Sequence, residues 1–476
     1  MESDKLKAIV IGTGVGGAGI AALLAGAGFS VKVFERSAFP GGKTAMYLRE
    51  GCEVDANVHT SPRGSKGPIG KLARVLGADL EIREIGPWRL VVGDRSTRLP
   101  LAFTKPFALV KIASVIRPRP LSMLGAIRLF RKVLSIKTEA DIAPYYGKPV
   151  SDLIAGYTTD QNLLTFFNIG GGMMFVIPAT DASAAEFLWG LSWWARDASV
   201  GYPLGGYGRV PASFLDVCER RGGEVRLDEP VTRIVVEGGR AVGVETAGGF
   251  YPAAIVVSNA GMKKTVELAG AGSFEEPYVE RVEALRDSLG AVTFKCALDY
   301  KPMDDALMLY VPEGWTYEDY FETIDAGRVP DDVPLYILSP TVIDPDLAPR
   351  GQHLLLACAP VPASLDHSDL AHKIADVVVH RLNRLFPGME DHILWQHKTD
   401  LEYIAELGGR GAGEAIGIAQ SYDQDGPNKP DPRLPVEGLY VVGVDAGGMG
   451  IGTERAADSA MKVFDMVMND MERRAP

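Results

Sequence analysis

The chain has 476 residues, a formal net charge of -12 at pH 7, and 46% hydrophobic and 23% charged residues. This length favours two domains over one core, and the acidic balance argues against a nucleic-acid partner, because a phosphate-binding surface must be basic. Residues 1–7 are polar and do not resemble a secretory signal, and four scattered cysteines suit neither a disulfide framework nor a zinc site, so we expect a cytoplasmic protein that uses no metal.

The first predicted element is a strand at residues 7–11, KAIVI, followed by the turn GTGVGG and an Ala- and Leu-rich helix. Gly12 would permit the tight turn, Gly14 would let the backbone approach a pyrophosphate, and Gly17 would let the helix pack closely. The first helical residues, Val15 and Gly16, would present N–H groups to the phosphates. The order and spacing of these residues predict a dinucleotide-binding unit.

A second strand, VKVFE, is predicted to end at Glu35, about 20 residues beyond the glycines. A carboxylate at this position can accept hydrogen bonds from an adenosine ribose and would repel a 2′-phosphate. FAD and NAD are therefore the candidate cofactors.

The residues after Glu35 read RSAFPGGK and bring a second glycine pair, Gly41 and Gly42, near the same dinucleotide. This stretch resembles the FAD-dependent amine oxidase and phytoene desaturase superfamily. The resemblance implies noncovalently bound FAD, with Arg36, Gly41, Gly42 and Lys43 joining the residues that hold it.

The resemblance continues through residues 205–261, where a predicted helix ends at Gly222-Gly223 and short β-rich runs follow. In the family this block returns the chain to the FAD domain, and the residue at Val231 contacts the adenine side through its backbone. The stretch SPTVIDPDLAPRGQHLLL, residues 339–356, resembles the phytoene desaturase branch, which includes carotenoid desaturases and isomerases and retinol saturase-like proteins.

Near the C-terminus, residues 439–444 predict a strand, residues 445–452 a glycine-rich loop, and a helix should begin at about Thr453. The resemblance implies that this loop, with Gly450 and Ile451, lies along the flavin. The helix N-terminus would face the edge of the flavin where negative charge accumulates on reduction. Asp445 is placed to accept hydrogen bonds from ribityl or ribose hydroxyls.

The expected fold class is α/β, with a Rossmann-like FAD-binding domain assembled from discontinuous segments and an α+β substrate domain of a mixed sheet plus helices. The FAD domain would comprise residues 1–100, 205–265 and 425–476. The substrate or lid domain would comprise residues 101–204 and 266–424.

The predicted substrate half contains a basic stretch, residues 105–137, with eight Lys or Arg residues and no acid. Its apolar residues recur at helical spacing, which fits either a helix resting on an anionic membrane or a lid helix packed on the protein itself. Residues 161–180 are uncharged, but their glycines and a proline favour a buried segment that lines a cavity over a membrane span. We expect an apolar wall from neighbouring Met and aromatic residues, namely Met173, Met174, Phe175, Phe187, Trp189, Trp193 and Trp194.

Two residues are candidates for acid-base chemistry. His59 follows a segment that passes close to the flavin in the family, where it could exchange a proton near neutral pH; the alternative is a plain loop histidine. Glu454 is either an ordinary first-turn acid of the last helix or a group beside the flavin.

The leading functional hypothesis is an FAD-dependent oxidoreductase that exchanges a hydride with a C–C bond of a hydrophobic isoprenoid or polyene, by desaturation, saturation or isomerisation. A flavin amine oxidase is the second hypothesis, and a non-catalytic lipid-binding chaperone of the GDP-dissociation-inhibitor type is the third. The glycines at 12, 14 and 17 and the complete C-terminal loop favour bound FAD. The external electron acceptor stays open among oxygen, a quinone and another redox protein.

Overall fold

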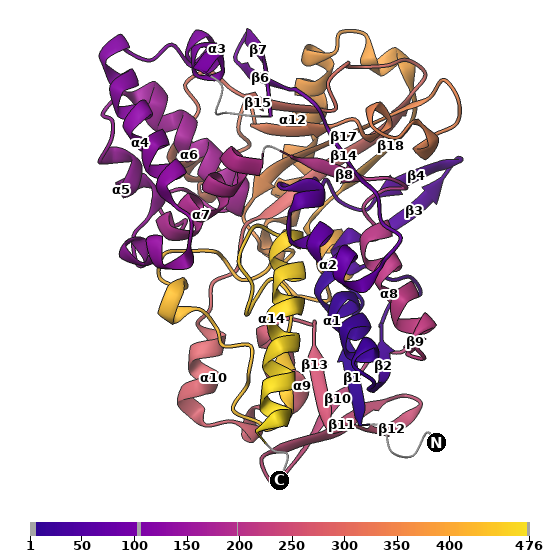
Figure 1. The fold of residues 1–476 in the computed structure, drawn as a ribbon. Coiled ribbons are helices and arrows are strands. Elements are labelled where there is room, and N and C mark those ends of the chain that lie inside the picture. The colour runs from indigo at the N-terminus through magenta and orange to yellow at the C-terminus, as the bar shows by residue number, and fades with distance from the viewer. Residues whose placement is uncertain (1–5, 102–105, 198, 474–476) are drawn as a thin grey trace.

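The computed structural model describes residues 6–101, 106–197 and 199–473. Figure 1 shows a lower body built around β1 and β2, with α1 and α14 in front of them, and an upper body built around β14 and β17. Helices α3 to α7 group beside the upper body.

The lower body contains a parallel sheet whose strands come from three separated parts of the chain. In spatial order these strands are β19 (Leu439–Val441), β13 (Ile255–Ser258), β1 (Lys7–Ile11), β2 (Ser30–Phe34) and β9 (Glu224–Arg226). All four pairings are parallel. Strands buried on both faces read as continuous apolar runs, which is why the KAIVI and IVVS sequences form β1 and β13.

The two faces of β1 pack against different layers. Ala8 and Val10 belong to the apolar cluster of α1 (Val15–Gly26), α8 (Arg209–Arg220) and α14 (Thr453–Glu472). Ile9 and Ile11 face the other way and pack with the antiparallel strands β10 (Arg233–Glu237) and β11 (Arg240–Thr246). β12 (Gly249–Pro252) completes that three-stranded sheet.

The upper body is a seven-stranded mixed sheet. Its spatial order is β18 (Ile393–Thr399), β14 (Gly290–Leu298), β17 (His353–Val361), β16 (Leu335–Leu338), β15 (Leu307–Val311), β6 (Trp88–Val92) and β7 (Arg95–Leu99). Only the β6–β15 pair among these is parallel. α12 (Ser368–Leu385) packs on β14 and β17 through an apolar stripe that includes Ile374 and Val378.

The helical group beside this sheet consists of α3 (Pro106–Ile116), α4 (Met123–Ser135), α5 (Val150–Ala155), α6 (Gln161–Phe175) and α7 (Ala184–Asp197). The remaining helices and strands of the described chain include α2 (Pro68–Leu76), α9 (Met262–Ala269), α10 (Glu276–Glu283), α11 (Tyr317–Asp325), α13 (Leu401–Gly408), β3 (Met46–Arg49), β4 (Cys52–Asp55), β5 (Ile82–Glu84) and β8 (Gly201–Pro203). None of the helices in the described ranges is long and apolar enough to cross a membrane.

The predicted α/β class is confirmed, with a discontinuous parallel sheet and a second, mixed sheet. Two segments lie with the other body than the predicted domain limits assign them to. β6 and β7 precede residue 100 but pair in the upper sheet, and residues of α10, beyond residue 265, pack in the apolar cluster of the lower sheet. Both differences arise from contacts between residues far apart in the chain, which local patterns do not encode.

The helix predicted from the spacing of Leu121, Leu124, Ile127, Phe130 and Leu134 is present as α4, and the basic stretch holds a second helix before it. Lys105 lies outside the described residues, and the rest forms α3 and α4, separated at Pro118 and Pro120. Proline cannot donate a backbone hydrogen bond and disfavours helical geometry in the residue before it, so the RPRP sequence ends α3.

Candidate functional site

The predicted glycine turn joins β1 to α1. Gly12 has a φ of 88°, a left-handed conformation that glycine adopts without strain. A Cβ at Gly17 would lie 2.0 Å from the Gly12 carbonyl oxygen, so only glycine allows the helix to begin this close to the turn. The N-cap residue of α1 is Gly14, and no side chain caps this helix end.

Asn259, at the end of β13, packs against the same turn. A Cβ at Gly14 would lie 2.6 Å from its Nδ2 atom, and a Cβ at Gly16 would lie 2.9 Å from its Oδ1 atom. Asn259 was not predicted as a site residue, although its position directly after a buried strand of the parallel sheet marks the edge where ligands bind in such folds.

A cavity of about 1100 Å³ opens at this turn, and we call it the glycine-rich cavity. It is lined by most of the predicted cofactor residues: Gly12, Gly14, Val15, Gly16, Glu35, Arg36, Gly41, Gly42, Lys43, Val231 and Asp445. Gly17 stands behind the turn as a packing residue. Gly450 lines neither this cavity nor the apolar cavity between the helical group and the upper sheet. Its carbonyl oxygen accepts a hydrogen bond from Gln420 Nε2 at 3.0 Å.

Glu35 and Thr13 connect the two glycine segments. The Glu35 carboxylate accepts hydrogen bonds from the Thr13 hydroxyl at 2.6 Å, from the Thr13 N–H at 2.9 Å and from the Ser37 N–H at 3.0 Å. The Thr13 hydroxyl in turn accepts the Gly41 N–H at 3.0 Å. These hydrogen bonds hold the buried Glu35 carboxylate rigidly at the cavity wall. Its Oε1 atom accepts the hydrogen bond from the Ser37 N–H.

Asp445 is paired within the protein rather than free for hydroxyl groups. Both carboxylate oxygens lie 2.9 Å from Arg410 Nη1, and the N–H groups of Met262 and Ile418 donate to them at 2.8 and 3.2 Å. Burial alone would raise the pKa of Asp445, but the Arg410 guanidinium holds it below its ordinary value. The expected role of Asp445 as a direct acceptor for ribityl hydroxyls is therefore weakened, because its oxygens already accept four hydrogen bonds from three donor groups.

Lys43 is likewise engaged. Its Nζ donates to the Glu414 carboxylate at 2.9 Å and also to the Glu414 backbone carbonyl. Burial lowers its pKa, although Glu414 opposes that shift. Arg410 and Glu414 come from the segment predicted as substrate domain, so that segment closes one side of the glycine-rich cavity.

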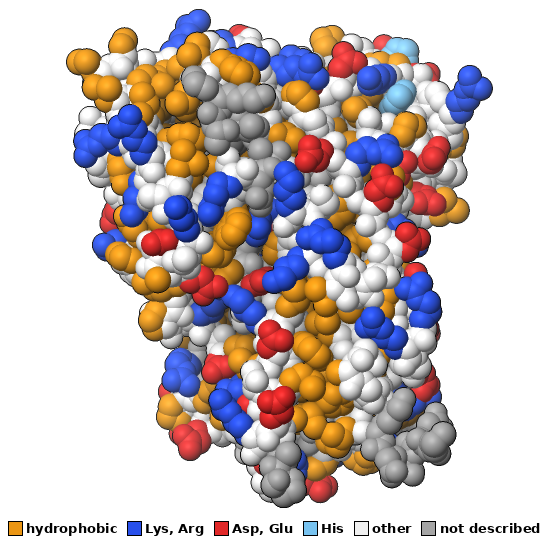
Figure 2. Space-filling model, viewed as in Figure 1, with side chains coloured by type: hydrophobic (Ala, Val, Ile, Leu, Met, Phe, Trp, Pro, Cys, Tyr) orange, Lys and Arg blue, Asp and Glu red, His pale blue; other side chains and the backbone are white. Residues whose placement is uncertain are grey.

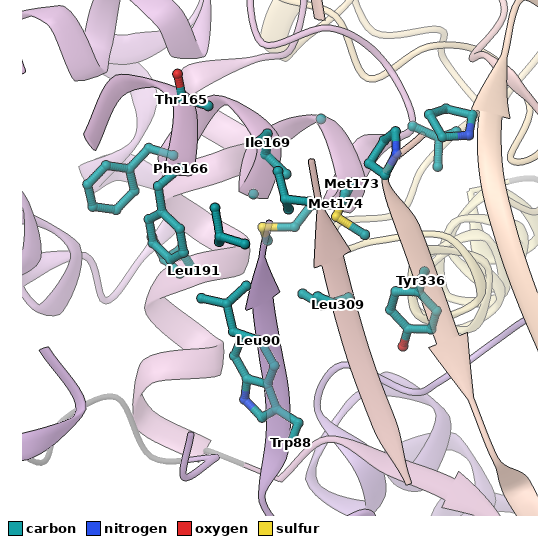
Figure 3. Close-up of a pocket in the computed structure, with 18 of the residues that line it drawn as sticks. Trp88, Leu90, Thr165, Phe166, Ile169, Met173, Met174, Leu191, Leu309 and Tyr336 are labelled. Carbon is teal, nitrogen blue, oxygen red and sulfur yellow. The ribbon is translucent and has the colours of Figure 1, made fainter. Parts of the chain in front are cut away.

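The apolar cavity, of about 630 Å³, lies between the helical group and the upper sheet. Figure 3 shows Leu90, Leu309 and Tyr336 on strands of the sheet and Ile169, Met173 and Met174 on the facing helix. Four members of the predicted wall line it: Met173, Met174, Phe187 and Trp194. Phe175, Trp189 and Trp193 are absent from this lining, and Phe175 and Trp189 pack in the apolar cluster of the helical group.

The two cavities meet at shared lining residues. These are His59, Ala415, Ile416, Gly452 and Thr453. α14 begins at Thr453, as predicted, so the positive end of its dipole points at this junction. Ile451, on the preceding loop, lines the apolar cavity.

His59 is the titratable side chain at the junction. Its ring stacks on Tyr207 with centroids 4.9 Å apart, and its buried Nδ1 atom has no hydrogen-bond partner among the described residues. Burial lowers the pKa of His59 to about 4 from an ordinary value of 6.5. The expectation of proton exchange near neutral pH is therefore corrected, because the imidazole stays neutral there.

Glu454 lies outside the linings of both cavities. Its carboxylate accepts hydrogen bonds from the Ser61 hydroxyl at 3.0 Å and the Arg63 N–H at 2.8 Å. This buried side chain ties the first turn of α14 to the loop after His59, and the geometry does not support the alternative of a group beside the flavin.

Lys295, which was not predicted as a site residue either, is fully buried in β14. Its Nζ donates to the Ala56 carbonyl, and burial lowers its pKa to about 7. Burial raises the pKa of nearby Asp55 to about 6, and that carboxyl group accepts the Tyr202 hydroxyl at 2.6 Å. A single lysine within the apolar run AVTFKCAL was the available signal, since an isolated charge is costly to bury.

The residues fit a dinucleotide with a flavin at the junction. The glycine turn lines the cavity at the start of α1, where no side chain caps the free N–H groups that a phosphate would need. Residues from the loops after β1, β2 and β19 also line the cavity, and His59 Nδ1 lacks a partner among the described residues at the junction. Within the described ranges, no group of His, Cys, Asp and Glu residues could hold a metal ion.

Comparisons with known proteins agree with this reading. The model of a family described as flavin containing amine oxidoreductase matches residues 18–463. Prolycopene isomerase 1 from an Oncidium hybrid cultivar is 25% identical, covering 100% of this chain and 86% of the relative. The zeta-carotene-forming phytoene desaturase of Myxococcus xanthus is 24% identical, covering 97% of this chain and 94% of the relative.

Solved structures share the fold. An oxidoreductase from Methanosarcina mazei superposes with a TM-score of 0.77 at 20% identity, over 97% of this chain and 100% of that one. A putrescine oxidase bound to putrescine superposes with a TM-score of 0.70 at 15% identity, over 98% and 99% of the two chains. Since the family model covers most of its length, the chain belongs to the flavin containing amine oxidoreductase family and is a flavin-dependent oxidoreductase.

Proposed function

We propose that the protein binds FAD noncovalently and exchanges a hydride with a C–C bond of an apolar isoprenoid or polyene. The observation that carries this proposal is the junction of the two cavities at His59, Ala415, Ile416, Gly452 and Thr453. A substrate in the apolar cavity would meet a cofactor in the glycine-rich cavity there and nowhere else in the described structure.

The chemistry of the apolar cavity favours a neutral substrate. Its charged lining residues are Arg95, Arg117 and Glu313, and Arg95 Nη1 pairs with Glu313 Oε1 at 2.7 Å. Arg117 and Glu313 are exposed, so these charges belong to the rim rather than to the depth of the cavity. A charged substrate would lose its hydration inside without gaining a partner, at a cost of several kcal/mol.

The named relatives support the same substrate class. They are a prolycopene isomerase and a phytoene desaturase, and both names denote enzymes of polyene chemistry. Desaturation, saturation and isomerisation would all use one site of this kind, so the reaction direction is left open within the proposal.

The protein's own residues would orient the reactants and exclude water. Bound FAD would supply the hydride chemistry. The N-terminus of α14 would stabilise negative charge at the junction, and neutral His59 would offer a hydrogen-bonding group without a charge.

An amine oxidase is the second candidate, because solved structures with this fold include a putrescine oxidase. A protonated amine entering the apolar cavity would find no carboxylate in its lining apart from Glu313 at the rim, within the part of the chain that the structure describes. The cavity therefore favours the polyene over the amine.

Product analysis tests the proposal. The holoprotein is incubated with detergent-dispersed isoprenoids and polyenes, and separately with amines. One series contains oxygen or a quinone as oxidant, a second uses chemically reduced flavin without oxygen, and the products of both are identified by mass spectrometry. A polyene that loses or gains a hydrogen pair, or changes geometry at constant mass, supports the proposal, whereas an aldehyde formed from an amine contradicts it. Acid precipitation should release intact FAD, and flavin that stays with the protein pellet contradicts noncovalent binding.

A further inference from the structure

Large apolar side chains are exposed on α3, on the short 3-10 turn Pro120–Ser122 and at the start of α4. The exposed fractions are 48% for Phe107, 69% for Val110, 83% for Leu121 and 63% for Leu124. Four of the thirteen exposed large hydrophobic residues of the described chain thus fall between residues 107 and 124. Single exposed apolar residues are ordinary, but a cluster of them marks an interaction surface.

Basic residues surround these side chains. Residues 106–138 contain no Asp or Glu, and their Lys and Arg residues are Lys111, Arg117, Arg119, Arg128, Arg131, Lys132 and Lys137. Figure 2 shows hydrophobic and basic side chains interspersed over the corner of the molecule that α3 and α4 form. The whole chain has a net charge of -12, whereas residues 106–138 carry only positive side-chain charges. This local positive charge attracts an anionic surface.

Four arginines of this region are free to meet external anions. Arg117, Arg119, Arg128 and Arg131 are exposed, and their guanidinium groups form no ion pair with a carboxylate in the described ranges. Arg117 also has a φ of 51°, and its carbonyl accepts a hydrogen bond from Asn162 Nδ2 at 3.0 Å. Its backbone is thereby fixed at the end of α3.

The opposite sides of the same helices line the apolar cavity. Ile112, Ile116 and Leu129 are buried there. The lining reaches the surface at Arg117 and at the first turn of α6, where Gln161 and Asn162 are exposed. The mouth of the cavity therefore adjoins the exposed apolar and basic residues.

We propose that this docking face, formed by Phe107, Val110, Leu121 and Leu124 with Arg117, Arg119, Arg128 and Arg131, binds the surface of an anionic lipid bilayer. The apolar side chains enter the boundary between headgroups and acyl chains, and the arginines pair with lipid phosphates. The cavity mouth then opens toward the bilayer, so an apolar substrate passes from lipid to protein without crossing water. Membrane docking is separate from the proposed reaction, because it determines the surface to which the protein binds and not the bond that it changes.

Vesicle flotation of the holoprotein tests the docking face. Vesicles of phosphatidylcholine alone are compared with vesicles of phosphatidylcholine mixed with phosphatidylglycerol, and no substrate is added. We expect binding to the mixed vesicles, which the double variant Leu121→Glu/Leu124→Glu weakens about tenfold or more. Arg128→Gln/Arg131→Gln should weaken binding about fivefold per charge removed, and only with anionic lipid.

Leu48→Glu is the matched control, because Leu48 is 74% exposed on β3, at the opposite side of the molecule from α4 in Figure 1. It should leave binding unchanged, and each variant's flavin absorption reports that the fold is intact. Failure of the wild type to float, or equal binding by the Leu121/Leu124 variant, overturns the proposal. Sedimentation velocity supplies a further contrary outcome: a wild-type dimer that this variant converts to monomer would assign the face to a second copy. Product formation in detergent is independent of these results, so the two proposals fail separately.

Discussion

A methyl group added at Gly17 would lie 2.0 Å from the Gly12 carbonyl oxygen, which is backbone and cannot rotate away. Gly17→Ala should therefore displace α1 from the turn, at a cost of about 1–3 kcal/mol, and reduce the flavin retained after purification. The ratio of flavin to protein absorbance measures this loss. Gly272→Ala is the matched control, because a Cβ there meets no atom within 4 Å. Equal flavin content in both variants would contradict the assigned packing role of Gly17.

The buried imidazole of His59 makes a prediction about pH. Its pKa is about 4 in the folded protein and 6.5 in its ordinary state, so the unfolded chain binds more protons between these values. Stability therefore rises with pH across this window, and acidification from pH 6.5 to about pH 5 should cost about 2 kcal/mol through this residue. In His59→Gln this contribution is absent, so the Tm of the variant should fall less than that of the wild type.

Differential scanning calorimetry at the two pH values measures this difference. His380→Gln, which removes an exposed imidazole, serves as the control and should follow the wild type. If His59→Gln loses as much Tm on acidification as the wild type does, the buried and neutral state assigned to His59 is wrong.

Among the elements, a buried charge cluster joins α7 of the helical group to the first turn of α14 and to the segment before β19. Glu186 on α7 lies 3.0 Å from Lys429 Nζ and 3.4 Å from Arg455 Nη1, and Gln420 Nε2 also donates to it. Burial alone would raise the pKa of Glu186, but Lys429 and Arg455 hold it at about 2. Glu186 therefore stays charged near neutral pH and ties α7 to its cationic partners, although burial lowers the pKa of Lys429 to about 8.

Glu186→Gln would leave two buried cations without their counter-charge, at a cost of about 3–5 kcal/mol. We expect a lower Tm and faster hydrogen exchange in α7 and the first turn of α14. Glu139→Gln makes the same chemical change in an exposed pair with Lys462, where side-chain exposure is 55% and the expected effect is below about 1 kcal/mol. Similar Tm losses in the two variants would show that the cluster does not hold these elements together.

Most elements around the cofactor could be predicted from the sequence, because each has a local pattern. The strand at 7–11, the helix at 209–220 and the start of α14 at Thr453 follow from apolar spacing and glycine positions. The last strand ends earlier than predicted, at Val441, since Gly443 has a φ of 115° and its N–H bonds to Ser459 Oγ. Lys295 and Arg410 were not predicted as site residues, because their partners are distant in sequence.

For the whole molecule, the parallel sheet needs strands from residues 7–34, 224–258 and 439–441, so the cofactor site exists only when distant segments have assembled. The resemblance of three separate motifs to one family made this arrangement predictable. The meeting of the two cavities was not predictable in detail, because it depends on Ala415 and Ile416, which carry no chemical signature.

In the proposed function, an apolar substrate reaches the flavin through this junction. The most direct measurement is the visible absorption of the holoprotein during anaerobic titration with polyenes and, in parallel, with amines. We predict that a polyene bleaches the oxidised flavin if the reaction is desaturation, or restores the absorption of flavin that has first been reduced if the reaction is saturation, and that amines do neither. Bleaching by an amine, with no response to any polyene, would contradict the account and assign the site to amine oxidation.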